Sequence, residues 1–301
     1  MKKLSIIAVL LFAIQLHGQQ DPQYTQYMYN LNIVNPAYAG SKENLSFGLL
    51  YRNQWTGIDG NPETGTFYGH SPVGNNLGLG LSLISDRLGP VQETNVYADV
   101  SYTLNLGGEH KLAFGVKAGA TFHDIGLASV AVLDPSDPFF NQNITEVTPN
   151  IGAGFFYYTN KYYVSLSVPN MLSSVHLDSN GNKIGSETQH YFLTGGYVFD
   201  LSPNTELKPS VMVKSAFDAP TSFDVNLNAR FFKKFEIGAS YRLDDSFSGL
   251  VNFALTSAVR VGYAYDAISS DIKAYAPASH EVFLLFDLDF PKRVSRSPRY
   301  F

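Results

Sequence analysis

The chain contains no cysteine and a single tryptophan among its 301 residues. Without cysteine it can have no disulfide framework, thiol nucleophile, cysteine zinc site or cysteine-linked lipid anchor. Charged residues make up only 16% of the chain, well below the roughly one quarter found in soluble globular domains. The formal net charge of -5 gives no electrostatic reason to expect a nucleic acid as partner.

Long hydrophobic runs are scarce as well. An apolar run at Leu4–Leu16 follows Lys2 and Lys3 and ends just before the small residue Gly18. A basic start, a short apolar core and a small residue predict a cleaved signal peptide over residues 1–18, with a buried helix as the alternative. A transmembrane helix needs about 18 or more apolar residues. The mature chain is therefore expected either to be soluble after export or to enter a membrane as strands.

From about Leu45 onward, apolar and polar residues alternate with the period of two that is typical of strands. In Phe223–Phe231 every second residue is apolar, and the residues between them run from Asp224 to Arg230. A slip of one residue would exchange the two faces, so the register is strongly specified. The pattern predicts about 14 strands, near residues 45–53, 63–70, 76–85, 91–104, 110–123, 148–158, 161–168, 188–199, 205–216, 221–231, 234–242, 247–256, 258–266 and 280–290.

The connections fall into two classes. Short ones, such as those at residues 159–160 and 232–233, alternate with long polar ones at residues 54–62, 124–147, 169–187 and 267–279. An even strand count with short turns at one end and long loops at the other predicts an outer-membrane barrel, and closure removes exposed strand edges. Aromatic residues beside the short turns fit an interfacial girdle. The alternative is a soluble sandwich with those rings in its core.

We therefore expect an all-β fold, a transmembrane outer-membrane β-barrel of antiparallel strands over residues 45–290. An N-terminal periplasmic or plug segment over residues 19–44 precedes it, and a basic tail over residues 291–301 follows, on the periplasmic side beside the N-terminus. Because buried charges need partners, mixed signs on the inner face predict internal ion pairs rather than a selective pore. The inward candidates are Arg52, Lys111, Lys117, Lys208, Lys214, Asp224, Arg230, Glu236, Arg242, Arg260, Asp287 and Asp289.

Five stretches follow one another in a recognisable order: DPQYTQYMYNLNIVNPAYAG at 21–40, YRNQW at 51–55, LGLGLSLISDRLGP at 77–90, VGYAYD at 261–266 and SHEVFLLFDLDF at 279–290. From about Gln20 to Phe290 the chain resembles the PorP/SprF family of type IX secretion membrane proteins. The resemblance implies a non-enzymatic barrel in the outer membrane of a Gram-negative bacterium. It also implies capture of a secreted, adhesin-like partner by its C-terminal secretion domain, contacts with periplasmic secretion components, and gliding motility in some members.

Candidate partner-binding residues lie in two regions outside the expected strands. Phe139 and Phe140 are adjacent in the longest predicted loop, where exposed rings suit protein docking; alternatively they fold back into the lumen. Tyr24, Tyr27 and Tyr38 are closely spaced in the N-terminal segment. That segment could contact a partner or act as a structural plug.

Arg52 and Trp55, at the end of the first expected strand, could anchor a partner through planar and cation-binding surfaces. They could equally hold the first loop against the barrel wall. The long loops 124–147 and 169–187 are expected to supply most of the outer surface that is available to a partner.

Sequence motifs of catalysis are missing: the hydrolase elbow, the phosphate-binding loop and the H-E-x-x-H helix do not occur. A partial calcium loop at Asp178–Asn182 has Lys183 where the glycine is required and Gln189 in place of the closing glutamate, so this stretch is predicted to be a polar hairpin tip. No catalytic, metal-binding or cofactor-binding residue is therefore predicted. Three functions stay open: a type IX accessory barrel that binds a secreted partner, a porin-like diffusion channel for small solutes, and an outer-membrane enzyme whose site is assembled from separate strands.

Overall fold

The computed structural model describes residues 22–42, 44–74, 76–129, 142–172, 175–179, 182–186, 189–216 and 219–289. The expected signal peptide, the basic tail, and Phe139 with Phe140 lie outside these ranges. Among the described residues, no helix is long and apolar enough to cross a membrane.

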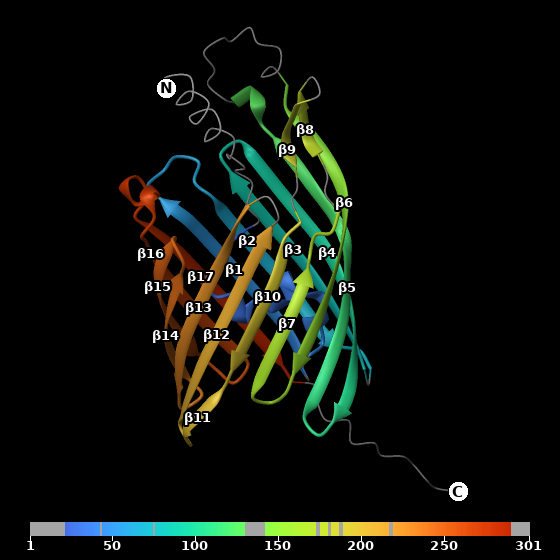
Figure 1. Ribbon diagram of the computed structural model, residues 1–301, viewed down its shortest axis with the longest axis vertical. Helices are drawn as coiled ribbons and strands as arrows, with labels where there is room; N and C mark the ends of the chain where they lie inside the picture. The colour runs from blue at the N-terminus through green and yellow to red at the C-terminus, as the bar shows by residue number, and fades with distance from the viewer. Residues whose placement is uncertain are drawn as a thin grey trace, which may run out of the picture.

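Within the described residues, one antiparallel sheet closes on itself (Figure 1). Closure comes from β10, which pairs with both β7 and β12, and from β1, which pairs with β17. The strands are β1 (Leu45–Thr56), β2 (Glu63–Pro72), β3 (Leu77–Leu88), β4 (Val91–Gly107), β5 (His110–Ile125), β6 (Ile144–Tyr158), β7 (Tyr162–Val168), β10 (Tyr191–Tyr197), β11 (Phe199–Ser202), β12 (Thr205–Ala216), β13 (Ala219–Phe231), β14 (Phe235–Arg242), β15 (Ser246–Ala254), β16 (Val259–Ile268) and β17 (Ala278–Leu288). Only Val198 separates β10 from β11, so the predicted 14-stranded barrel is confirmed.

One predicted loop contains strands. β8 (Val175–Ser179) and β9 (Asn182–Ser186) pair only with each other and project beyond the barrel at the top of Figure 1. The predicted connection over residues 169–187 therefore contains a hairpin, whose tip falls within Asp178–Asn182 as the sequence predicted. Its two strands were not predicted, because apolar residues are too sparse there to show an alternation: Val175 and Leu177 in one strand and Ile184 in the other.

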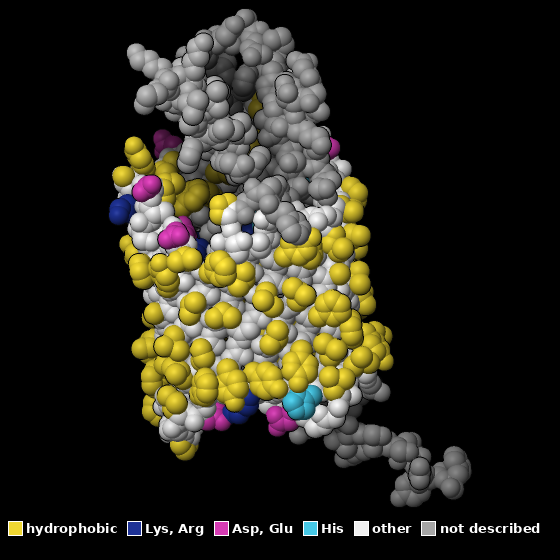
Figure 2. Space-filling model, in the orientation of Figure 1, with side chains coloured by type: hydrophobic (Ala, Val, Ile, Leu, Met, Phe, Trp, Pro, Cys, Tyr) yellow, Lys and Arg dark blue, Asp and Glu magenta, His cyan; other side chains and the backbone are white. Residues whose placement is uncertain are grey.

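The barrel is polar inside and apolar outside. In β3, Leu77, Leu79, Leu81 and Leu83 are exposed on the outer face, with Leu81 63% exposed, while Ser82 on the inner face is buried. Figure 2 shows hydrophobic side chains covering the visible wall between the two ends of the barrel. This arrangement excludes the soluble sandwich, because so large an exposed apolar surface requires lipid around it.

Aromatic rings gather at the short-turn end of the wall. Tyr162 stacks on Tyr197 with ring centroids 6.0 Å apart, and Tyr197 lies 4.4 Å from Phe199. Both pairs flank the turns at the bottom of Figure 1, where β6 meets β7 and β11 meets β12. The predicted aromatic girdle is present at this end, as expected at a membrane–water interface.

The N-terminal segment lies inside the barrel. It contains the short helices η1 (Tyr27–Tyr29), α2 (Leu31–Val34) and η2 (Pro36–Tyr38). Gln23 bonds to Arg242 at the long-loop end, whereas Lys42 pairs with Asp287 at the short-turn end. The segment therefore runs through the lumen from one mouth to the other. Gln23 and the end of β17 thus lie at opposite ends of the barrel, and the expectation that the C-terminal tail lies beside the N-terminus stays a prediction, because both ends of the chain fall outside the described residues.

Candidate functional site

We call residues 22–42 the plug, because their side chains pack with inward residues of the wall to form the core inside the barrel. Tyr27, Leu31, Ile33 and Val34 are buried and pack in one cluster with inward residues of the wall such as Phe283. The plug is polar where it meets polar strands: Asn30, Asn32 and Asn35 are also buried. The lumen is thus a packed, mixed interior.

Glycines on β3 and β5 let the plug backbone touch the wall, and Gly154 on β6 leaves room for the side chain of Asn35. A Cβ atom on Gly78 would lie 2.2 Å from the carbonyl oxygen of Ala39, and one on Gly115 would lie 2.1 Å from the nitrogen of Ala37. Neither position could carry a side chain without moving the plug, which is the usual reason for glycine where two backbones approach closely. Alternating glycines in this part of the wall therefore form the seat of the plug.

Asn35 fixes the turn that fills this seat. Its side-chain oxygen accepts a hydrogen bond from the backbone nitrogen of Ala37 at 2.8 Å, which caps the helix η2. Its side-chain nitrogen donates to the hydroxyl of Ser165 at 2.6 Å and to the carbonyl of Phe155 at 2.9 Å. One asparagine thus organises the local turn and ties it to two strands of the wall.

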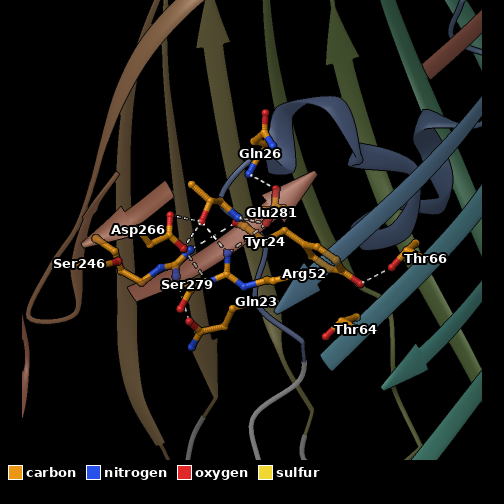
Figure 3. A network of polar contacts seen from close by, with 12 residues as sticks. Gln23, Tyr24, Gln26, Arg52, Thr64, Thr66, Ser246, Asp266, Ser279 and Glu281 are labelled. Atoms are coloured by element: carbon orange, nitrogen blue, oxygen red, sulfur yellow. Dashed lines mark hydrogen bonds and ion pairs between the residues drawn. The ribbon is translucent and has the colours of Figure 1, made fainter. Parts of the chain in front are cut away.

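A buried ion network holds the first part of the plug (Figure 3). The guanidinium of Arg52 lies 2.8 Å from Asp266 and 3.1 Å from Glu281, and all three side chains are at most 2% exposed. Arg52 also donates to the hydroxyl of Thr25 at 2.9 Å, and that hydroxyl donates to Asp266 at 2.8 Å. Glu281 accepts the backbone N–H groups of Thr25 and Gln26 at 2.8 and 2.9 Å.

Two further pairs repeat this pattern. Arg242 lies 2.6 Å from Asp224 and donates to the carbonyl oxygen of Tyr24 at 3.3 Å. Lys117 lies 3.4 Å from Asp99 and donates to the carbonyl oxygen of Ile33 at 3.1 Å. In each case a buried cation of the wall is shared between a wall carboxylate and a plug carbonyl. Buried charges are tolerated when they are paired and hydrogen-bonded in this way.

At the short-turn end, where the plug continues into β1, an ion pair ties it to the wall. The ammonium of Lys42 lies 2.9 Å from Asp287. Burial alone would lower the pKa of Lys42, but the electrostatic interactions with Tyr38 and Asp287 outweigh it and raise that pKa above its ordinary value. Lys42 therefore keeps its charge and its partner at neutral pH.

The predicted internal ion pairs are confirmed for Arg52, Lys117, Lys208, Asp224, Arg230, Glu236, Arg242 and Asp287. Sequence reasoning missed the carboxylates Asp99, Asp266 and Glu281. Asp99 and Lys117 are direct neighbours on β4 and β5, as are Glu281 and Arg52 on β17 and β1. Pairing opposite charges across adjacent strands would have found both.

The candidate partner-binding residues are divided between the lumen and its outer mouth. Arg52, Tyr24 and Tyr27 are buried in the lumen, and Tyr38 packs edge-on against His70 and Phe156. For the three tyrosines this is the geometry of the structural alternative, a plug in the lumen, whereas Arg52 bonds to Thr25 of the plug instead of holding the first loop against the wall. A direct role of these four residues in binding a partner stays a prediction.

Trp55 lies at the mouth of the barrel on the long-loop side. A bulge between β1 and β17 gives it a positive φ of 57°, and its backbone nitrogen donates to Ser279 at 3.0 Å. It lines a cavity of about 290 Å³ together with Lys214 and Arg242. A bulge that redirects a side chain toward an open cavity is frequent beside functional sites. Among the described candidates, Trp55 is thus the one that borders the outer mouth.

The closed wall, its apolar outer face and its polar lumen define an outer-membrane β-barrel. The family model described as type IX secretion system membrane protein PorP/SprF matches residues 16–286 of the chain. The protein belongs to this family, and the resemblance seen in the sequence is confirmed.

Two solved structures share the architecture. The Ralstonia pickettii toluene transporter TbuX superposes with a TM-score of 0.54 at 10% identity, covering 85% of this chain and 92% of that one. The CymD monoaromatic hydrocarbon channel gives a TM-score of 0.52 at 13% identity, covering 85% of this chain and 91% of that one. At such identities the likeness concerns the fold alone. No curated protein sequence matches the chain.

Proposed function

We propose that this barrel is a non-enzymatic binding component of the type IX secretion system. In this role it captures an exported, adhesin-like protein by its C-terminal secretion domain and helps to export it or hold it at the cell surface, in some cells for gliding motility. Family membership supports a place in secretion. The observation that carries the binding role is the plug, whose residues 22–42 occupy the lumen and bond to the wall along their length. With the lumen occupied, the surfaces at the two ends are left for partners.

The outer end is the proposed surface for the exported partner. It carries the β8–β9 hairpin, the loops between β5 and β6 and between β7 and β10, and the cavity beside Trp55. Phe139 and Phe140 belong to one of these loops by sequence. We propose that these rings and Trp55 contact the partner. The contacts of the plug tyrosines Tyr24, Tyr27 and Tyr38 with the wall, and those of Arg52 with the plug, would keep the plug inside the barrel beneath that surface. The short-turn end would face periplasmic components of the secretion system.

The porin-like alternative requires an open lumen. The described plug crosses the lumen from Gln23 to Lys42 and is bonded to opposite sides of the wall by Lys117 on β5 and Arg242 on β14. A barrel filled in this way would not conduct as a general porin does, so binding is the function that the geometry supports best.

The proposal is tested by measuring secretion and surface retention of the exported partner in cells that carry loop variants of this barrel. Residues 175–186, which contain the β8–β9 hairpin, are replaced by a glycine-serine linker. The matched control alters the short-turn end by Phe232→Ser, which leaves the outer surface intact. We expect surface retention of the exported partner to fall with the hairpin replacement and to persist with the control, at equal barrel levels in the outer membrane. Unchanged secretion and retention after replacing this hairpin together with residues 130–141 would contradict the proposal.

A further inference from the structure

The plug contacts the two sides of the barrel unequally. Against β3 and β5, glycines bring backbone to backbone, with no room for even a Cβ atom at Gly78 or Gly115. Against β12–β15, the wall presents long polar side chains instead, among them Lys208, Asp224 and Arg242. The plug is therefore tightly seated on one side and separated from the wall by polar groups on the other.

Two amides on the inner face of β13 lack partners. Among the described residues, both side-chain polar atoms of Asn226 and the side-chain oxygen of Asn228 make no hydrogen bond, although both residues are only 1% exposed. Buried polar groups in proteins are almost always hydrogen-bonded, to protein atoms or to ordered water. Neighbouring amides on the inner face of one strand therefore indicate a hydrated space, since each can hydrogen-bond to a water molecule.

Two cavities approach this region from opposite ends. The cavity of about 290 Å³ at the long-loop mouth is lined by Gln23, Ser222 and Arg242. A second cavity, of about 280 Å³, opens at the short-turn end and is lined by Ser210 and Asn228, among others. Both cavities thus include residues of β13 or its neighbours.

The separation between the two cavities is small. Arg242 is paired in register with Asp224, which stands four residues from Asn228 on the same strand. At about 3.3 Å per residue, the two cavities are roughly 13 Å apart along this wall. Asn226, with its unpartnered amide, occupies the position between them.

Tyr27 lies between the two cavities. It follows Gln23, which lines the upper cavity, and precedes Met28, which lines the lower one. Its hydroxyl donates to Ser210 on β12 at 3.2 Å, and its side chain is 1% exposed. The ring thus spans from the plug to the polar wall at the level where the two cavities would otherwise meet.

We propose that a polar side passage for water and small uncharged solutes runs between the plug and strands β12–β15, closed at Tyr27. Arg242 is paired with Asp224 and Lys208 with Glu236, so this part of the wall carries both signs and favours neutral permeants over ions. This passage is independent of partner binding. It would make the barrel permeable to small uncharged solutes whenever the ring of Tyr27 is displaced or removed.

The chain's lack of cysteine allows a direct test of hydration. Asn226→Cys places a sole thiol in the proposed passage, and Ser167→Cys places one at the tight seat, where Ser167 donates to the carbonyl oxygen of Val34. Both native residues are at most 2% exposed. We expect a small uncharged, polar methanethiosulfonate to label Asn226→Cys in the folded barrel and to leave Ser167→Cys unlabelled. Equal protection of the two thiols would overturn the hydrated passage.

Permeability is tested with Tyr27→Ala in proteoliposomes that swell in glycerol. The matched control is Tyr24→Ala, which removes a second buried plug ring, one whose hydroxyl lies 3.1 Å from that of Thr66 on β2. We expect swelling to be several-fold faster with Tyr27→Ala than with wild type, Tyr24→Ala or Tyr27→Phe. Equal rates for Tyr27→Ala and Tyr24→Ala, whether slow or fast, would overturn the assignment of the closure to Tyr27.

Discussion

Replacing Arg52 by Met should destabilise the barrel by loosening the plug. Arg52 is the only cation within 4 Å of both Asp266 and Glu281 among the described residues, at 2.8 and 3.1 Å, and all three side chains are nearly inaccessible to solvent. Methionine keeps much of the volume but leaves two buried carboxylates without their cation. It also removes the hydrogen bond to Thr25 of the plug.

The expected magnitude follows from the cost of an uncompensated buried charge. Breaking a buried ion pair by removing one partner costs about 3–5 kcal/mol. Glu281 keeps two backbone N–H donors from the plug, which offsets part of the loss and favours the lower end of that range. The additional change Glu281→Gln removes one of the stranded charges, so the double variant should be more stable than Arg52→Met alone.

The free energy of unfolding in detergent micelles is measured by urea titration, for wild type, Arg52→Met and the double variant. Lys161→Met, which removes an exposed ion pair with Asp200 at a short turn, serves as the control and should unfold like wild type. If Arg52→Met also unfolded like wild type, or if adding Glu281→Gln made it worse, the account of a charged anchor for the plug would be refuted.

Three further predictions concern the seat, the outer wall and the exit of the plug. Gly115→Ala places a Cβ atom 2.1 Å from the nitrogen of Ala37 and should cost about 1–3 kcal/mol by overpacking; Gly65→Ala, where nothing lies within 4 Å, should be tolerated in the same urea titration. Leu81→Lys on the outer face should cost up to about 2–4 kcal/mol in lipid vesicles, whereas equal stability in vesicles would contradict a lipid-facing position. The raised pKa of Lys42 means that its contribution to stability is complete below the unfolded pKa of about 10.4 and is lost as pH rises through the folded pKa. Lys42→Met should therefore unfold with a weaker alkaline dependence than wild type.

The strands could be predicted because the lipid-facing and lumen-facing residues alternate so regularly, as in Leu77–Leu83. The same alternation assigned Arg52 and Lys117 to the inner face, and because buried charges need partners, it also predicted that they form ion pairs there. Glycine on the inner face of such a strand, as at Gly78, is a local sign that another backbone approaches. That signal was present in the sequence and would have favoured the plug over a segment beneath the barrel.

Other features were beyond the reach of local patterns. The plug has no periodicity of its own, because its short helices are set by contacts with many strands, such as those of Asn35 with the carbonyl of Phe155 and the hydroxyl of Ser165. The pair between Arg52 and Asp266 joins β1 to β16 across β17, and it exists only because the sheet closes. The direction of the plug through the lumen likewise depends on contacts made at both mouths, by Gln23 and by Lys42.

The central claim is that this barrel works by binding an exported protein. The most direct measurement is a mild-detergent pull-down of the tagged barrel from its native outer membrane, followed by mass spectrometry of the proteins retained. The account predicts recovery of a large exported protein, and loss of that protein when its C-terminal secretion domain is deleted. Recovery of the barrel alone, together with solute conductance by the wild-type protein in planar bilayers, would contradict it.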